Sequence, residues 1–471
     1  MIWLVEASFI AGSSCHMQGC ELTREGMERF KFKFIFVKEA FVMNVLPVAG
    51  IDVGKEFSEM AILSPTNKVY ARMKFFHDSF KKVDKAIDLL KKAEKDFAIR
   101  PVIAMESTGH YHKILFHAFA EAGFEIVITN PLQTNCINNL GIRKVKSDKV
   151  DARKVALLYR FQELKTTSIP NDTTDCLKSL CRQYYKMTDQ LTAYKNKLIG
   201  IVDQVMLNFT DVFKDVTSKT ALALLEKYPT PTLMLEGKRD EIISLISKTS
   251  RMGVKRATSK YELLIQKAKD FEPLSISSPA NISLIQININ MVRTLEKSIS
   301  DIEDAIAKLI EDDSNKDMPV LALTLELLCS IPGIGLMTAA TILAEVGDFS
   351  KFQKPNKLVA FFGIDPSVKQ SGKFEGTQNK MSKRGSRFLR KALYISALAN
   401  IRKKRNGELN NPVLYEYYQK KCVNKPKMVA LGAVMHKLVY IIFAVLRDKK
   451  TFELRTPEQH AKHLAAKNDA A

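Results

Sequence analysis

Apolar positions follow two different periods along this chain of 471 residues, and the change of period divides it into regions. Between residues 47 and 165, short apolar runs alternate with segments of helical period. The expected strands are 48–53, 58–63, 69–76, 102–105 and 125–129, and the expected helices are 81–97, 110–122 and one that opens near 148. Strands that alternate with helices predict an α/β domain whose sheet is covered on both faces.

A long helical region follows, from about 170 to 318. Two apolar seams run through it with alternating spacings of three and four: Leu177, Leu180, Tyr184, Met187, Leu191, Tyr194, Leu198, Ile201 and Val205, and later Val292, Leu295, Ile299, Ile302, Ile306 and Leu309. Such spacing predicts a coiled coil, formed either within one chain or between subunits. Both possibilities stay open at this point. Residues 206–280 lie between the seams and are expected to form a helical insertion.

The C-terminal region, 320–450, is expected to be mostly helical. The sequence Ile-Pro-Gly-Ile-Gly at 331–335 joins two apolar helical segments and is typical of a helix-hairpin-helix. Gly333 and Gly335 would allow a tight turn, after which a helix N-terminus presents backbone N–H groups to a phosphate. Residues 1–46 match neither pattern and are expected to be a disordered extension or a misassigned start. Residues 451–471 are expected to be a tail.

The charge of the chain is strongly basic and unevenly distributed. The net charge is +21 with a pI of about 9.5, and residues 369–450 hold 20 Lys and Arg against four acidic residues. This excess predicts a polyanionic partner, DNA or RNA. The basic side chains that we expect at the nucleic acid are Lys369, Lys373, Lys383, Arg384, Arg387 and Lys391. Positions 384, 387 and 391 would share one face of a helix, which suits a phosphate backbone.

The seven cysteines and the apolar segments indicate no export or membrane insertion. The cysteines show no CxxC pair, which indicates reduced thiols of a cytoplasmic protein. The apolar run 428–446 contains His436 and Lys437 and is therefore expected to be a buried helix instead of a membrane span.

Four carboxylates occupy positions that suggest a cation site. Asp52 and Glu106 end two expected strands, and Asp148 and Asp151 open a helix three residues apart, on one face. Sites in α/β sheets lie at the carboxyl ends of the strands. Carboxylate oxygens are the ligands that Mg²⁺ prefers. We therefore predict that these four residues hold Mg²⁺ or Mn²⁺.

The segments around these carboxylates resemble those of a known family. Gly-Ile-Asp-Val-Gly-Lys begins at 50, Glu-Ser-Thr-Gly at 106 and Ser-Asp-Lys-Val-Asp-Ala at 147. In this order they resemble the DEDD transposases of bacterial insertion sequences, the IS-one-ten family. The resemblance covers 47–165 and 320–450. It implies a RuvC-like fold, related to RNase H, for the first region and a transposase domain with a serine nucleophile for the second.

By position the nucleophile would be Ser371, within Lys-Gln-Ser-Gly-Lys at 369–373, and Ser382 is the rival candidate. Ser382 could equally cap the helix that follows it. The resemblance implies site-specific DNA recombination of an insertion sequence through a serine–DNA covalent intermediate, at a site shared between two domains. It also implies a structured guide RNA, a homo-oligomer (dimer or tetramer) and a nucleoid-associated protein of a bacterium or archaeon. The alternatives are a metal-dependent RuvC-like junction nuclease that uses water as the nucleophile, and a non-enzymatic nucleic-acid scaffold.

Overall fold

The computed structural model describes residues 46–107, 110–129, 148–161, 172–314, 320–367, 370–371, 374–375, 380–456 and 458–462. The chain divides into two compact units, Met1–Ile169 (unit 1) and Pro170–Ala471 (unit 2), and each is described by itself. The predicted extension 1–46 lies outside the described residues, except for Leu46. The predicted helical region and the predicted C-terminal region both belong to unit 2.

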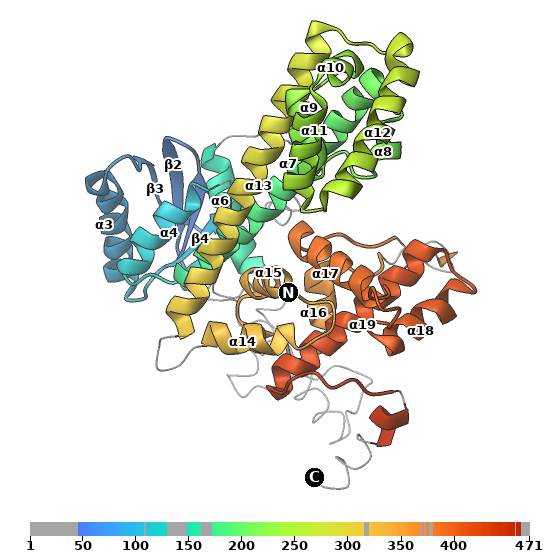
Figure 1. Ribbon diagram of the computed structural model, residues 1–471. Helices are drawn as coiled ribbons and strands as arrows, with labels where there is room; N and C mark the ends of the chain where they lie inside the picture. Colours follow the sequence, from blue (N-terminus) through green and yellow to red (C-terminus); the bar gives the residue numbers. More distant parts are fainter. Residues whose placement is uncertain are drawn as a thin grey trace, which may run out of the picture. The chain divides into compact units, whose positions relative to one another are not determined.

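Unit 1 is built on a five-stranded sheet in the order β3-β2-β1-β4-β5 (Figure 1). The strands are β1 (Val48–Val53), β2 (Phe57–Leu63), β3 (Val69–Phe76), β4 (Val102–Glu106) and β5 (Ile126–Thr129). The first three form an antiparallel meander, β4 is parallel to β1, and β5 is parallel to β4. The predicted α/β fold of this region is therefore confirmed.

Helices cover both faces of this sheet. Helices α3 (Phe80–Phe97) and α4 (His112–Glu121) supply Leu90 and Phe119 to an apolar core that includes Ile51 of β1. Helix α6 (Asp148–Phe161) lies on the other face, where its apolar side chains meet Val48 of β1. The contact of α6 with β1 is close, because a Cβ at Gly50 would lie 2.1 Å from the carbonyl oxygen of Ala152.

Unit 2 contains two long helices, α7 (Asp172–Met206) and α13 (Pro279–Ser314), which carry the two predicted seams. They pack along each other within one chain, and an ion pair of 2.8 Å joins Lys195 to Glu296. This arrangement is the intrachain alternative for the seams. The coiled-coil geometry itself stays a prediction.

The predicted insertion is helical. It consists of α8 (Phe209–Val212), α9 (Lys219–Lys227), α10 (Pro231–Glu236), α11 (Arg239–Ser250), α12 (Val254–Phe271) and the 3-10 helix η1 (Glu272–Leu274). The hydroxyls of Ser218 and Thr230 accept hydrogen bonds from first-turn N–H groups of α9 and α10, as good N-caps do. These helices share one apolar core with the end of α7 and the start of α13.

The second core of unit 2 is formed by the other ends of α7 and α13 together with the C-terminal helices. These are α14 (Val320–Cys329), α15 (Leu336–Val346), the 3-10 helix η2 (Phe349–Lys351), α16 (Pro355–Phe362), α17 (Arg387–Asn400), α18 (Pro412–Cys422) and α19 (Lys427–Asp448). Two short strands, β6 (Gln370–Ser371) and β7 (Phe374–Glu375), pair antiparallel between α16 and α17.

Helix α19 is the one helix among the described residues that is long and apolar enough to cross a membrane, with a mean hydropathy of 2.1. Half of that stretch is buried inside the structure, and α19 packs against α14, α16, α17 and α18. The cysteines Cys176, Cys181, Cys329 and Cys422 are free thiols. Burial raises the pKa of the Cys181 thiol to about 11, so this side chain is a packing group.

Candidate functional site

Unit 1 contains one group of candidate residues, in which two carboxylates end adjacent parallel strands. The strand register pairs Ile51 of β1 with Met105 of β4. The next residue of each strand is Asp52 in β1 and Glu106 in β4, so these two residues are neighbours across the strand pair. Asp52 is the fifth of six residues in β1, and Glu106 is the last residue of β4. Both side chains are half-buried. Since the carboxyl ends of parallel strands meet at one edge of the sheet, these two carboxylates lie at the same edge.

Helix α6 runs antiparallel to β1 and brings its N-terminus to this same edge. Near the helix C-terminus, Arg160 donates from Nη2 to the carbonyl oxygens of Leu46 (2.5 Å) and Ser64 (2.8 Å), which precede β1 and follow β2. Further back along the helix, Ala152 lies against Gly50, in the middle of β1. The helix start at Asp148 must therefore lie over the end of β1. We call this end of unit 1, with Asp52, Glu106 and Asp151, the acidic edge.

The carboxylates of the acidic edge also share one face of the sheet. Side chains alternate along a strand, so Asp52 points to the same face as Val48 and Gly50, and Glu106 to the same face as Ala104. Val48 and Ala104 pack against α6. The side chain of Asp148 lies outside the described residues, although its backbone begins α6.

The donor set of this edge consists of carboxylates, which suit a hard divalent cation. Asp151 carries an ion pair to Lys154, with 2.8 Å between carboxylate and ammonium. Within the described part of the chain, no three His, Cys, Asp or Glu side chains stand close enough together to hold a metal ion. The chemistry of these donors therefore suits such a cation, but the described side chains are not gathered around one point, and the Asp151 carboxylate would have to exchange an ammonium for the cation.

Unit 2 contains another group of candidate residues. Ser371 is the last residue of β6 and pairs with Phe374, the first residue of β7, and two residues, Gly-Lys, stand between them in the sequence. The strand pair therefore places Ser371 at the tip of a short hairpin. Its side chain, and both Lys369 and Lys373, lie outside the described residues.

Ser382 is placed differently, because its hydroxyl is fixed inside a loop. The hydroxyl donates a hydrogen bond of 2.5 Å to the carboxylate of Asp365, and the Ser382 N–H donates to the Asp365 carbonyl oxygen at 2.8 Å. Ser386, not Ser382, caps α17 by accepting from the N–H groups of Phe388 and Leu389. The alternative that Ser382 caps the helix is therefore wrong. We call residues 363–367 together with 380–386 the loop cluster.

The loop cluster packs so closely that a glycine is required within it. A Cβ at Gly385 would lie 2.0 Å from the carbonyl oxygen of Phe361. The Lys383 N–H donates to the Gly363 carbonyl oxygen at 3.0 Å, and Lys383 has a left-handed backbone with a φ of 54°. Arg390 donates from Nη1 to the Gly385 carbonyl oxygen at 2.6 Å. Burial lowers the pKa of Arg390 below its ordinary value, as expected of a guanidinium that supports the fold.

The predicted basic helix face differs from the observed one. Helix α17 begins at Arg387, because Ser386 caps it, so Arg384 belongs to the loop cluster and not to the helix. Lys383, Arg384 and Arg387 are exposed. The Lys391 ammonium lies 2.5 Å from the carboxylate of Asp189 on α7, which offsets its charge.

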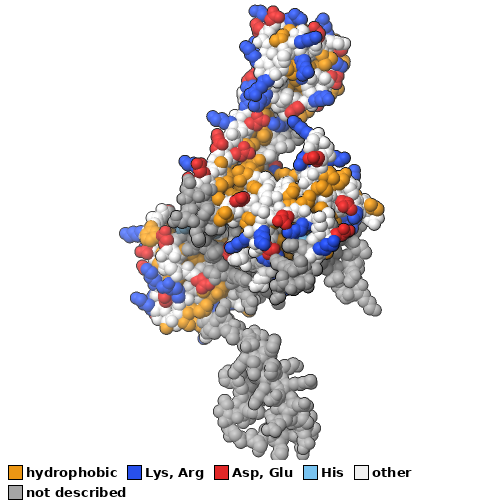
Figure 2. Space-filling view, turned by 60° about the horizontal axis from the view of Figure 1, so that its bottom comes forward, with side chains coloured by type: hydrophobic (Ala, Val, Ile, Leu, Met, Phe, Trp, Pro, Cys, Tyr) orange, Lys and Arg blue, Asp and Glu red, His pale blue; other side chains and the backbone are white. Residues whose placement is uncertain are grey.

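Sequence reasoning did not single out a second basic group, residues 402–405, in the turn between α17 and α18. All four residues, Arg-Lys-Lys-Arg, are exposed. The backbone there folds back, with Lys404 N–H donating to the Glu408 carbonyl oxygen at 2.7 Å. The run of four consecutive basic residues is the feature of the sequence that could have identified this group. Figure 2 shows one face of the structure, on which basic and acidic side chains are intermixed and no single large basic patch forms.

The helix-hairpin-helix turn joins α14 to α15. Gly333 has a φ of 77°, which only glycine adopts readily, and a Cβ there would lie 2.5 Å from Nδ2 of Asn400 on α17. Gly335 is the N-cap of α15, is exposed and forms no side-chain cap. The first-turn N–H groups of α15 are therefore available to an anion.

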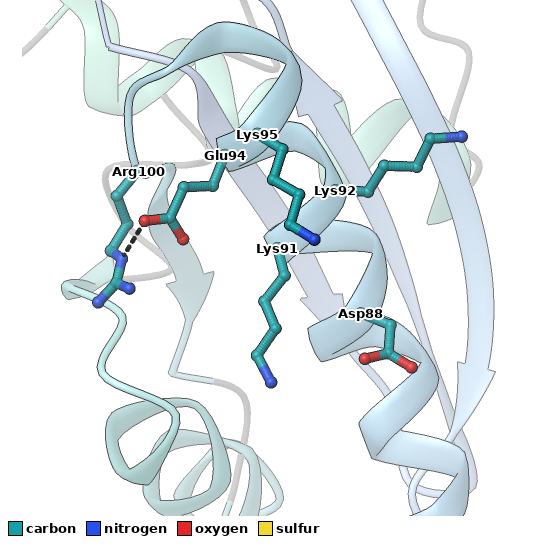
Figure 3. A pocket seen from close by; sticks show the side chains of 6 residues that line it. All are labelled: Asp88, Lys91, Lys92, Glu94, Lys95 and Arg100. Atoms are coloured by element: carbon teal, nitrogen blue, oxygen red, sulfur yellow. Dashed lines mark hydrogen bonds and ion pairs between the residues drawn. The ribbon is translucent and has the colours of Figure 1, made fainter.

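A hollow on the outer side of α3 is distinct from the acidic edge (Figure 3). Its lining side chains are Asp88, Lys91, Lys92, Glu94, Lys95 and Arg100. Glu94 and Arg100 form an ion pair of 2.9 Å there. Helix α3 packs on the sheet face that Ile51 occupies, opposite to the face of Asp52. The hollow therefore has no part in the acidic edge.

Two family models match the chain. One, a DEDD transposase model of the IS110 type, matches residues 49–207, and the other, described as Transposase IS116/IS110/IS902 family, matches residues 325–419. Both describe transposases, so the chain is a transposase, an enzyme that acts on DNA. It belongs to the IS110 family, the one that the sequence segments resemble.

Individual proteins that are similar to this chain come from insertion elements or invert a pilin gene, as their names state. The insertion element IS110 43.6 kDa protein of Streptomyces coelicolor is 23% identical over 342 residues, which cover 72% of this chain and 79% of the relative. The IS116 44.8 kDa protein of Streptomyces clavuligerus is 20% identical over 87% of this chain and 96% of its own length. The pilin gene-inverting protein of Moraxella lacunata is 29% identical over 36% of this chain and 49% of the relative.

Among solved structures, Thermus thermophilus RuvC in complex with a Holliday junction substrate is similar to this chain, with 14% identity and a TM-score of 0.21. The match covers 26% of this chain and 99% of RuvC. The assignment of unit 1 to the α/β class follows instead from its own strand order and directions.

Proposed function

We propose that this transposase recombines DNA through a covalent serine–DNA intermediate, with Ser371 as nucleophile and the carboxylates Asp52, Glu106, Asp148 and Asp151 as ligands of Mg²⁺ or Mn²⁺. The observation that supports the proposal is the acidic edge, where strand register puts Asp52 and Glu106 on one face and at one end of the sheet and where α6 begins with Asp148. The position of Ser371 at the tip of a hairpin supports its role as the reacting hydroxyl.

In the proposed reaction, the Ser371 oxygen forms a bond to a DNA phosphorus, and the bond from that phosphorus to a deoxyribose oxygen breaks. The serine proton ends on the departing sugar hydroxyl. Attack by a sugar hydroxyl of another strand reverses both changes and joins the strands without loss of bond energy. A bound divalent cation would stabilise the charge that develops on the serine and phosphate oxygens.

The remaining parts of the proposal concern nucleic-acid partners. Lys369, Lys373, Lys383, Arg384 and Arg387 would contact phosphates, as would the N–H groups after Gly333 and Gly335 at the start of α15. Lys391 would contribute less, because its charge is shared with Asp189. Guidance by a structured RNA and assembly into a homodimer or homotetramer belong to the same proposal. Recovery of a defined RNA with the purified protein, and a measured mass of two or four chains, are the expected results.

The test of the mechanism is covalent trapping with a DNA substrate, followed by denaturing electrophoresis. The wild-type protein should form an adduct, Ser371→Ala should form none while still binding DNA, and Ser382→Ala should keep the adduct. An adduct that survives in Ser371→Ala and vanishes in Ser382→Ala would assign the nucleophile to Ser382. If cleavage proceeds in both variants without an adduct, water is the nucleophile and the chain acts as a metal-dependent junction nuclease.

A further inference from the structure

A fifth carboxylate lies beside Asp52, on the neighbouring strand. Glu59 of β2 is the direct antiparallel partner of Asp52. Directly opposed residues of an antiparallel pair point to the same face, with Cβ atoms about 4.5–5.5 Å apart. Leu63, four residues along β2, packs against α6, so the face of Glu59 is the α6 face that Asp52 also occupies. Glu59 therefore shares both the face and the end of the sheet with the acidic edge.

The Glu59 side chain is buried and has no partner in the described part of the chain. Only 6% of the residue is exposed, and no hydrogen bond or ion pair to another described residue reaches its carboxylate. Its register partner on β3 is Lys74. The Lys74 ammonium instead lies over the ring of Phe57, 3.6 Å from the ring centre. Among the described residues, the Glu59 carboxylate thus has no ion-pair partner, and it lies beside Asp52.

This arrangement is unfavourable unless something else balances it. Like charges directly opposite each other destabilise a strand pair. A divalent cation at the acidic edge would convert this repulsion into attraction. On the same face of β2, positions 61 and 63 hold the buried apolar residues Ala61 and Leu63. Packing alone would therefore be satisfied by an apolar residue at position 59.

We infer that Glu59 is a further oxygen donor for the divalent cation of the acidic edge, and that it acts together with Asp52. The inference rests on the proposed function, because it concerns the cation that the four predicted carboxylates would hold. Glu59 then sets how tightly the cation binds, and the sequence Phe-Ser-Glu-Met-Ala-Ile-Leu of β2 contains an acid for this reason.

The experiment measures Mn²⁺ binding to the full-length protein by electron paramagnetic resonance, and thermal unfolding with and without Mn²⁺. Glu59→Gln keeps the shape and removes the charge. We expect its Mn²⁺ affinity to fall by more than about 10-fold, because the loss of a direct oxygen donor should cost at least as much as the loss of a supporting group. Its melting temperature without metal should equal or exceed that of the wild type, because the repulsion with Asp52 is gone. Glu59→Asp keeps the charge and should bind Mn²⁺ with intermediate affinity.

Two further variants distinguish a failure of the inference on Glu59 from a failure of the proposed cation site. Glu121→Gln, an exposed acid at the end of α4, should change neither quantity. If Asp52→Asn loses Mn²⁺ binding while Glu59→Gln keeps wild-type affinity, the inference fails and the proposed function stands. If Asp52→Asn itself binds Mn²⁺ like the wild type, the proposed cation site fails.

A purely structural role for Glu59 would show as a lower melting temperature of metal-free Glu59→Gln with unchanged Mn²⁺ affinity, and this result would overturn the inference. Should Glu59→Gln fail to fold, as judged by circular dichroism, Glu59→Asp decides the question. Wild-type Mn²⁺ affinity in Glu59→Asp would then count against the inference, and weaker binding would support it.

Discussion

The acidic edge of unit 1 and the loop cluster of unit 2 position their polar groups by different physical means. At the acidic edge, Asp52 and Glu106 are placed by the hydrogen-bond register of β1 with β4, which does not depend on their side chains. In the loop cluster, Ser382 itself, together with Arg390 of α17, forms hydrogen bonds that hold the backbone in place. Asp52 and Glu106 can therefore lose their charge without a change in sheet register, whereas Ser382 and Arg390 cannot be changed without altering the loop.

This difference decides how variants of the two regions should behave. Substitutions that remove charge at the acidic edge should affect activity and spare stability. Substitutions of the side chains that hold the loop cluster together should instead affect stability. The predictions below test this separation, beginning with the largest expected effect.

Asp52→Asn should reduce strand exchange by more than about 100-fold, because removal of a direct ligand should exceed the roughly 10- to 100-fold cost of removing a supporting group. The folded state should survive, since sheet register and not the carboxylate holds β1. Strand exchange assays and circular dichroism measure the two quantities. Full activity in EDTA, or in Asp52→Asn, would contradict the cation site.

Gly50→Ala and Gly385→Ala compare the rigidity of the two regions directly. Each new Cβ would meet a backbone oxygen, at 2.1 Å from Ala152 and at 2.0 Å from Phe361. We expect Gly50→Ala to lower the free energy of unfolding of unit 1 by about 3 kcal/mol, because sheet and helix cannot separate easily. Gly385→Ala should cost about 1–2 kcal/mol, because loops relax more readily.

Amide hydrogen exchange, measured at increasing denaturant concentrations, gives the free energy of unfolding of each unit separately. Gly200→Ala, where a Cβ would meet no atom within 4 Å, is the control and should be neutral or stabilising. Equal losses in Gly50→Ala and Gly385→Ala would show that the loop cluster is as rigid as the sheet.

The same difference explains what could be predicted from the sequence. The strands and helices of unit 1 were predicted to within about two residues of their observed ends, because apolar period and glycine positions mark them locally. The predicted strand-end positions of Asp52 and Glu106 are confirmed. Glu59 was not identified, because a single acid in an apolar strand gains meaning only from the register with the neighbouring strand.

Around the loop cluster and α17 of unit 2, the decisive contacts join residues that are distant in the sequence. The ion pair of Lys391 with Asp189 spans 202 positions, and no local pattern indicates it. The predicted start of the helix observed as α17 was wrong for a related reason. Ser382 and Ser386 both precede the helix, and only the hydrogen bond of Ser382 to Asp365 shows which of them is free to cap it.

Replacing Arg384 and Arg387 together by Ala should weaken binding to unrelated DNA sequences equally. Each lost phosphate contact should lower the magnitude of the slope of log affinity against log salt by about 0.9, so the double variant should lose about 1.8. Lys391→Ala is the matched control and should change the slope less, because its ammonium is paired with Asp189. Fluorescence anisotropy at several salt concentrations measures the slope. An unchanged slope would place the phosphate contacts elsewhere, with residues 402–405 as the first alternative.

Ser382→Ala should have the smallest effect of these changes, and it should act on stability. It removes a hydroxyl that donates to the Asp365 carboxylate at 2.5 Å, and hydrogen bonds to charged groups contribute about 1.5–3 kcal/mol. Because Asp365 is only half-buried and water can replace the hydroxyl, we expect a loss of about 1 kcal/mol in the free energy of unfolding. A double-mutant cycle with Asp365→Ala should yield a coupling energy of similar size. Covalent adduct formation should persist in Ser382→Ala. Unchanged stability together with a lost adduct would mean that the Ser382 hydroxyl reacts with DNA. Ser382 would then be a reacting group and not a residue that holds the loop cluster together. The contrast with the acidic edge, which is held by its backbone, would no longer apply to this residue.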